Sequence, residues 1–150
     1  MSHTPSIVWF KRDLRNHDHA PLLAASQLNS PVIPLYIVEP EYWQQAFASR
    51  RHWHFIHDCL VDLNIALTDL GQPLIVRVGD VCDVIAQLHE QHDVGDVYMH
   101  EETGNSWTYD RDQRVQKLCL DRNISSHEFP TNGVVRRLRS RDDWSKIRNV

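Results

Sequence analysis

Five short runs of consecutive apolar residues recur along the chain, at residues 7–10, 32–38, 74–78, 97–99 and 124–129. Runs that are apolar at consecutive positions, and not at alternate ones, are typical of strands buried on both faces, as in a parallel sheet. Such strands need a covering layer on each side of the sheet. This feature therefore predicts five strands at these positions.

The segments between the runs have the periodicity of amphipathic helices. The clearest helix is predicted to end at Gly71, and its apolar stripe is formed by Trp53, Ile56, Leu60, Leu63, Leu67 and Leu70. Further helices are predicted from Asp18 as N-cap towards residue 28, over 81–88 with Asp80 as N-cap, and over 107–122. Alternating strands and helices predict an α/β fold: a doubly wound, five-stranded parallel Rossmann-like sheet with helices on both faces, in one domain over residues 1–133.

The composition excludes several classes of function. Only five glycines are present, and neither G-x-G-x-x-G nor G-x-x-x-x-G-K-[ST] occurs, so side chains would have to hold any phosphate or ring system. The formal net charge of -4 does not favour nucleic acid over the whole surface, although residues 134–150 are locally basic. No apolar run approaches the roughly 18 residues of a membrane span. Three widely spaced cysteines predict reduced thiols in a cytoplasmic protein.

Ligands of open parallel sheets bind beyond the carboxyl ends of the strands. Lys11, Arg12, Asp13 and Arg15 follow the first predicted strand, where Arg12 can fork onto a phosphate or carboxylate and Asp13 can orient it. The alternative is a solvated strand end with local ion pairs.

Glu101, Glu102 and Trp107 follow the fourth predicted strand. The carboxylates can accept hydrogen bonds from a heterocycle, and Trp107 can stack on it. The alternative is a loop in which Thr103 or Asn105 caps the next helix. Three nearby histidines, His52, His54 and His57, lack a recognised zinc spacing, so no metal site is predicted. No Ser-His-Asp or Cys-His arrangement can be singled out among ten histidines, so no catalytic residue is predicted.

The chain resembles the N-terminal α/β domain of the cryptochrome/photolyase family. The resemblance rests on IVWFKRDLRNHDHAPL at 7–22, PVIPLYIVEP at 31–40, SRRHWHFIHDCLVDLNIALTDLGQPLIVRVGD at 49–80, and Tyr109, Arg111 and Asp112. Two places depart from the family's usual pattern: His19 stands where Asn is common, and MHEETGNSWT at 99–108 replaces the commoner N-R-x-Y-x-P loop.

The resemblance implies a light-harvesting antenna chromophore in this domain: a reduced folate, a deazaflavin or a flavin. It assigns Arg12, Arg51 and the Glu101/Glu102 pair to the antenna site, to which the residue patterns add Asp13 and Trp107. It also implies a C-terminal helical domain, absent from this chain, that binds FAD and repairs UV-damaged DNA. Residues 134–150 would begin the linker to that domain, and this chain alone would not repair DNA.

Two other functions are consistent with the sequence. The same fold serves in cryptochrome blue-light photoreceptors, and residues up to 150 cannot separate these from photolyases. A small nucleotide-binding α/β module is the third hypothesis, although the glycine-rich phosphate loop usual in such modules is missing.

Overall fold

The computed structural model describes residues 4–131, so the predicted linker at 134–150 lies outside the described residues. Five parallel strands and five helices follow one another as β1 (Ser6–Phe10), α1 (Ala20–Ser26), β2 (Val32–Val38), α2 (Pro40–Trp43), α3 (Arg50–Asp69), β3 (Ile75–Val78), α4 (Val81–His92), β4 (Asp96–His100), α5 (Ser106–Asp121) and β5 (Ser125–Phe129). The strand order is β3-β2-β1-β4-β5. The doubly wound sheet predicted from the apolar runs is confirmed.

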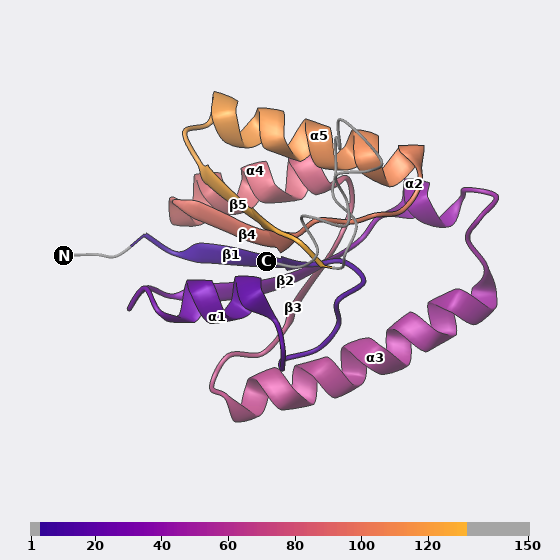
Figure 1. The fold of residues 1–150 in the computed structure, drawn as a ribbon, viewed down its shortest axis with the longest axis horizontal. Coiled ribbons are helices and arrows are strands. Elements are labelled where there is room, and N and C mark those ends of the chain that lie inside the picture. Colours follow the sequence, from indigo (N-terminus) through magenta and orange to yellow (C-terminus); the bar gives the residue numbers. More distant parts are fainter. Residues whose placement is uncertain (1–3, 132–150) are drawn as a thin grey trace, which may run out of the picture.

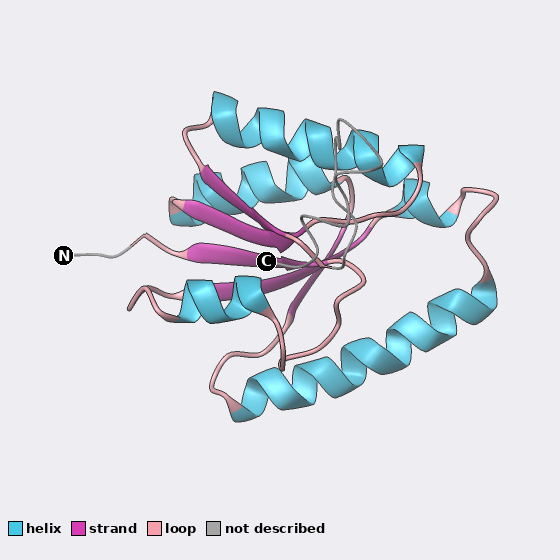
Figure 2. Ribbon diagram, in the orientation of Figure 1, coloured by secondary structure: helices cyan, strands magenta, loops and turns pink. Residues whose placement is uncertain are grey.

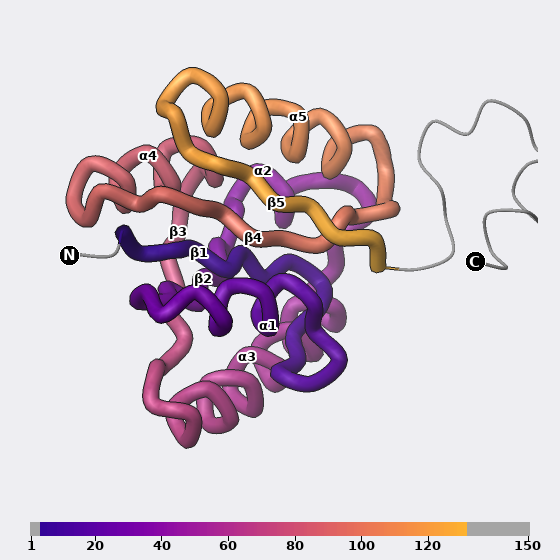
Figure 3. Tube along the Cα trace, turned by 60° about the vertical axis from the view of Figure 1, so that its left-hand side comes forward, coloured from indigo at the N-terminus to yellow at the C-terminus, as the bar shows by residue number. Residues whose placement is uncertain are grey.

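Helices cover both faces of the sheet (Figures 1 and 2). α4 and α5 lie on one face, and α1 and α3 lie on the other, as the turned view also shows (Figure 3). β1 is central, pairing in parallel with β2 and with β4. Its side chains alternate between two cores: Ile7 and Trp9 face α4 and α5, and Val8 and Phe10 face α1 and α3. β1 is therefore buried on both faces, which explains its unbroken apolar run.

The long predicted helix is α3, which buries Ile56, Leu60, Leu63 and Leu67. It ends before Gly71, whose φ of +99° favours glycine. Leu70 is an exception to the predicted stripe, because it lies at the C-cap, beyond the last helical residue, and is 70% exposed.

Two details of the helices differ from expectation. α2 was not predicted, since four residues are too few to show a periodicity, although Pro40 begins it. The predicted N-cap of α1 was wrong: His19, and not Asp18, occupies the cap, and its side chain accepts a hydrogen bond from the backbone N–H of Leu22. Asp18 instead adopts a positive φ of 47° in the preceding loop.

Candidate functional site

Charged side chains gather at the carboxyl ends of β1, β2 and β4. The strand order reverses between β1 and β4, so a crevice is expected beyond their carboxyl ends. Six charged side chains there are buried, which is costly unless they are paired: Lys11, Asp13, Glu39, Glu102, Arg111 and Asp112.

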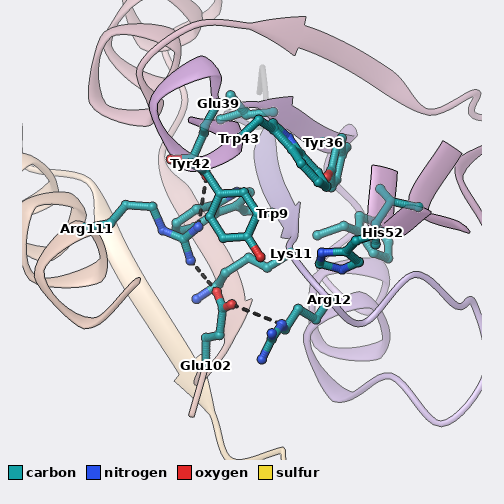
Figure 4. Close-up of a pocket in the computed structure, with 13 residues that line it drawn as sticks. Trp9, Lys11, Arg12, Tyr36, Glu39, Tyr42, Trp43, His52, Glu102 and Arg111 are labelled. Atoms are coloured by element: carbon teal, nitrogen blue, oxygen red, sulfur yellow. Dashed lines mark hydrogen bonds and ion pairs between the residues drawn. The ribbon is translucent and has the colours of Figure 1, made fainter. Parts of the chain in front are cut away.

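Arg111 is the centre of a buried ionic network (Figure 4). Its guanidinium donates to Glu39 Oε2 at 2.8 Å, to Asp112 Oδ1 at 3.1 Å and to Glu102 Oε2. Lys11 Nζ donates to the other oxygen of Asp112 at 2.9 Å. Three elements that lie far apart in the sequence, the ends of β1 and β2 and the first turns of α5, are thereby joined at one point.

The Glu39 carboxyl is the least well compensated member of this network. Burial raises the pKa of Glu39, and the carboxylates of Glu102 and Asp112 raise it further, to about 7 despite the Arg111 ion pair. The side chain therefore changes its protonation near neutral pH.

Aromatic rings and the ionic network enclose a small cavity of about 30 Å³, which we call the aromatic cavity. It is lined by Trp9, Phe10, Lys11, Arg12, Tyr36, Ile37, Glu39, Tyr42, Trp43, His52, Ile56, Glu102 and Arg111. Tyr42 and Trp43 reach it from α2 (Figure 4). The Trp9 ring faces two cations, with Lys11 Nζ 4.5 Å and Arg111 Cζ 5.0 Å from its centroid.

A larger cavity of about 290 Å³ adjoins it, and because polar and charged residues line it we call it the polar cavity. It is lined by Lys11, Arg12, Asp13, Arg15, His100, Glu101, Glu102, Thr103 and Thr131. Lys11, Arg12 and Glu102 line both cavities. The polar cavity lies at the ends of β1 and β4, where the topology predicts a ligand site.

Asp13 is fully engaged by hydrogen bonds and does not orient Arg12, so that sequence interpretation was wrong. Its Oδ1 accepts from the backbone N–H of Lys11 at 2.8 Å, and its Oδ2 lies 2.6 Å from both His19 Nε2 and His100 Nδ1. Burial alone would raise the pKa of Asp13, but the bonds from His100 and His19 outweigh it and hold the pKa well below its usual range. Asp13 therefore positions two histidines and the start of α1.

These three residues are the only group of potential metal ligands within residues 4–131 that converge closely enough to share an ion. His19 is nevertheless unsuited to this role. Its Nδ1 accepts the Leu22 N–H, so in the neutral ring Nε2 carries the hydrogen and has no lone pair for a metal. The predicted absence of a metal site at His52, His54 and His57 stays a prediction; His52 packs on Trp43, with ring centroids 5.3 Å apart.

The structure brings most of the predicted site residues together. Arg12, Glu101 and Glu102 line the polar cavity, although the Arg12 side chain is 57% exposed and 3.5 Å from Glu102. The ring centroid of Trp107 lies 5.5 Å from that of Tyr42 and 5.6 Å from Arg111 Cζ. Arg51 is exposed and lines neither cavity. Asn105 caps α5, so the loop after β4 both caps a helix and supplies Glu102.

Several residues of the site escaped sequence reasoning. Glu39 and His100 end or follow a strand, so the rule that selected Arg12 also applied to them. Tyr42 and Trp43 also lie in the segment that follows the second predicted strand, but nothing in the sequence indicated the short helix α2 that directs them to the cavity.

Comparison with known proteins decides the family. The family model of DNA photolyase matches residues 6–144. The chain belongs to the DNA photolyase family. A cryptochrome DASH from Gloeobacter violaceus is 30% identical over 145 residues, which cover 91% of this chain and 26% of that protein. A deoxyribodipyrimidine photo-lyase from Escherichia coli is 40% identical over 86 residues, covering 57% of this chain and 18% of that protein.

Solved structures of photolyases and cryptochromes have the same fold. A class III photolyase from Agrobacterium tumefaciens superposes with a TM-score of 0.79 at 24% identity, over 95% of this chain and 29% of that one. A cryptochrome from Synechocystis gives a TM-score of 0.77 at 27% identity, over 85% and 28%. This photolyase-family chain has the fold of the family's N-terminal α/β domain, and it spans about a quarter of its first relatives. Among the described helices, none has the length and apolar character needed to cross a membrane.

Proposed function

We propose that the chain is the N-terminal light-harvesting domain of a DNA photolyase. The observation that carries the proposal is the aromatic cavity, where stacking rings and buried hydrogen-bonding groups converge beyond the ends of β1 and β2. A flat heterocyclic pigment needs both: aromatic faces for its rings, and polar groups for its ring N–H and carbonyl groups.

The residues of the aromatic cavity fit a reduced folate, a deazaflavin or a flavin in chemistry. Glu39 and Glu102 accept hydrogen bonds from ring N–H groups, and Arg12 pairs with an anionic group of the pigment. At about 30 Å³ the cavity has room for little more than a water molecule, so three fused rings do not fit. In the proposed complex, Tyr42 and Trp43 move aside with the four-residue helix α2 and stack on the pigment.

The remaining functions belong to a longer protein in this proposal. A C-terminal helical domain would bind FAD and act on UV-damaged DNA, and this domain would pass excitation energy to the FAD. The basic residues of 134–150 would begin the linker to that domain: Arg136, Arg137, Arg139, Arg141, Lys146 and Arg148. No catalytic residue is assigned to this chain.

A cryptochrome photoreceptor is the second candidate function, because the relative that covers 91% of this chain is a cryptochrome DASH. In that case the same pigment site would serve signalling. A repair assay with UV-damaged DNA, on a protein that carries both domains, separates the two.

The pigment site is tested by titrating the chain with a reduced folate, an 8-hydroxy-deazaflavin and a flavin in turn. Trp9 and Trp43 line the cavity, so a bound pigment that absorbs in the near ultraviolet should quench tryptophan fluorescence by energy transfer. We expect saturable quenching by one of these pigments.

Two variants test where that pigment binds. Arg12→Gln should weaken binding roughly tenfold, the effect of one charge-assisted hydrogen bond. Arg77→Gln is the matched control, since Arg77 is exposed on β3 and lines neither cavity, and it should bind as the unchanged chain does. Equal loss in both variants, or no binding of any pigment, would contradict the proposed site.

A further inference from the structure

The hydrogen bond to Asp13 fixes the tautomer of His100. An ionised carboxylate can only accept hydrogen bonds, so at 2.6 Å the Nδ1 of His100 must be the donor to Asp13 Oδ2. His19 does not supply the hydrogen of this bond, because its own Nε2–H donates to the same oxygen of Asp13. The neutral His100 ring therefore has its proton on Nδ1 and a lone pair on Nε2.

The His100 lone pair is available to a ligand. The residue is 6% exposed and lines the polar cavity, and Nε2 has no hydrogen-bond partner among residues 4–131. In the same range, the fully buried side-chain nitrogen and oxygen atoms without a partner are Ser6 Oγ and Ser30 Oγ. His100 Nε2 also lacks a partner within residues 4–131 but is not among these fully buried atoms. It is therefore accessible, and the cavity that His100 lines is the polar cavity.

Arginines complete the polar cavity from the loop between β1 and α1. Arg15 is held in place because its Nε and Nη2 donate to the Asp18 carbonyl at 3.2 and 3.0 Å. Arg12 is half exposed at the cavity's edge. At about 290 Å³ the cavity has room for several water molecules, and hence for a small anion.

The charges of the cavity favour an anion that also donates a hydrogen bond. Three cationic side chains line it (Lys11, Arg12 and Arg15), but so do three carboxylates (Asp13, Glu101 and Glu102). A fully deprotonated oxyanion would meet Glu101 and the His100 lone pair with no hydrogen to share. An oxyanion that keeps a proton satisfies the donors and the acceptors of the cavity together. A site built to accept a ligand's O–H discriminates strongly against a ligand that lacks this group, because the acceptor is then left unpaired.

We propose that the polar cavity is a binding site for inorganic phosphate as hydrogen phosphate. Arg12 and Arg15 donate to its oxygens, and its single O–H donates to His100 Nε2. The site is distinct from the pigment site of the proposed function, because it occupies the other cavity, although Lys11, Arg12 and Glu102 border both.

Calorimetric titration of the chain with phosphate, sulfate and methyl phosphate at pH 7 and fixed ionic strength tests the proposal. At this pH inorganic phosphate keeps at least one proton and sulfate keeps none, while a phosphomonoester, with a second pKa of about 6, is mostly deprotonated. We expect phosphate to bind roughly tenfold or more tightly than the other two, the worth of one hydrogen bond to a charged group. Equal affinities, or tighter binding of sulfate, would overturn the proposal.

His100→Asn tests the acceptor itself. The Asn amide can donate to Asp13 as the imidazole does but offers no lone pair in the position of Nε2, so the preference for phosphate should disappear. His127→Asn is the matched control, since His127 lies on β5, outside the lining of the polar cavity, and it should keep the preference. A preference that survives in His100→Asn would reject the assigned acceptor.

Nitrogen-15 NMR of the unchanged chain gives the same answer without a substitution. The His100 Nε2 signal should move on adding phosphate but not on adding sulfate. An Nε2 signal whose chemical shift does not change at saturating phosphate would overturn the site even if phosphate binds elsewhere. Neither measurement depends on a pigment, so a failure here leaves the proposed function standing.

Discussion

Two buried polar networks lie side by side at the carboxyl end of the sheet, and their carboxyl groups respond to burial in opposite ways. The pKa of Asp13 falls well below its usual range, whereas that of Glu39 rises to about 7. Asp13 has three N–H groups directed at it, from a backbone amide and two imidazoles. Glu39 shares one guanidinium with two other carboxylates. The supply of donors for each carboxylate, and not burial as such, sets the direction of the pKa shift.

The largest expected effect comes from removing the shared cation. Arg111→Leu leaves Glu39, Glu102 and Asp112 buried without that partner, and it should lower the free energy of unfolding by about 3–5 kcal/mol. Urea unfolding at pH 7 measures this. Arg114→Leu on the same helix is the control, because Arg114 is half exposed and its pair with Asp80 is worth less than about 1 kcal/mol. Similar losses in the two variants would show that the network around Arg111 is not the stabilising one.

Asp13→Asn should have the next largest effect, about 3 kcal/mol at pH 7, because the amide's own N–H groups oppose the histidine donors. The folded-state pKa of Asp13 is lowered, so the carboxylate stabilises the fold above its unfolded pKa of about 4, and this contribution is lost as the pH falls further. The deficit of the variant should therefore shrink below pH 4. Urea unfolding at neutral and acid pH checks both points. Asp58→Asn on the exposed side of α3 is the control, and a deficit that is constant with pH would refute the explanation.

Glu39→Gln should have the smallest effect on the free energy of unfolding, and its dependence on pH should be opposite in sign to that of Asp13→Asn. The folded-state pKa of Glu39 is raised, so its protonated form stabilises the fold, and stability is lost as the pH rises from about 4.5 through 7. Between pH 5 and 8 the unchanged chain should lose about 2 kcal/mol that Glu39→Gln does not lose. Glu90→Gln, on the exposed surface of α4, should keep the slope of the unchanged chain. Identical slopes for all three proteins would mean that Glu39 does not titrate in this range.

Much of the fold could be predicted from sequence because each strand carries its own signal. The apolar run of β1 reflects two cores that meet the same strand, and the stripe on α3 reflects one face buried against the sheet. The start of α1 was mispredicted because Asp is among the preferred N-cap residues, although an N-cap at Asp18 would place Pro21, which has no N–H, at the N3 position. In the structure His19 is the N-cap, and its side chain also makes a tertiary hydrogen bond to Asp13.

The site was predictable in its location but not in its partnerships. The rule that ligands bind beyond strand ends selected Arg12, Glu101 and Glu102. The pairing of Arg111 with Glu39 spans 72 residues, and local spacing carries no information on it. Arg51 was assigned by resemblance alone, and the structure places its exposed side chain outside both cavities.

The central position of β1 also has a consequence for how the chain folds. Lys11 finds its partner Asp112 at a separation of 101 residues, and β1 pairs with β4 as well as with β2. Contacts between such distant residues require closing a long loop before any stabilisation follows, which slows folding. On the ribosome, where the amino end emerges first, the first strand made must wait for the last third of the domain before its charged end is neutralised. The unpaired edges and apolar surface of this half-made sheet are the state in which the nascent chain is most exposed to aggregation.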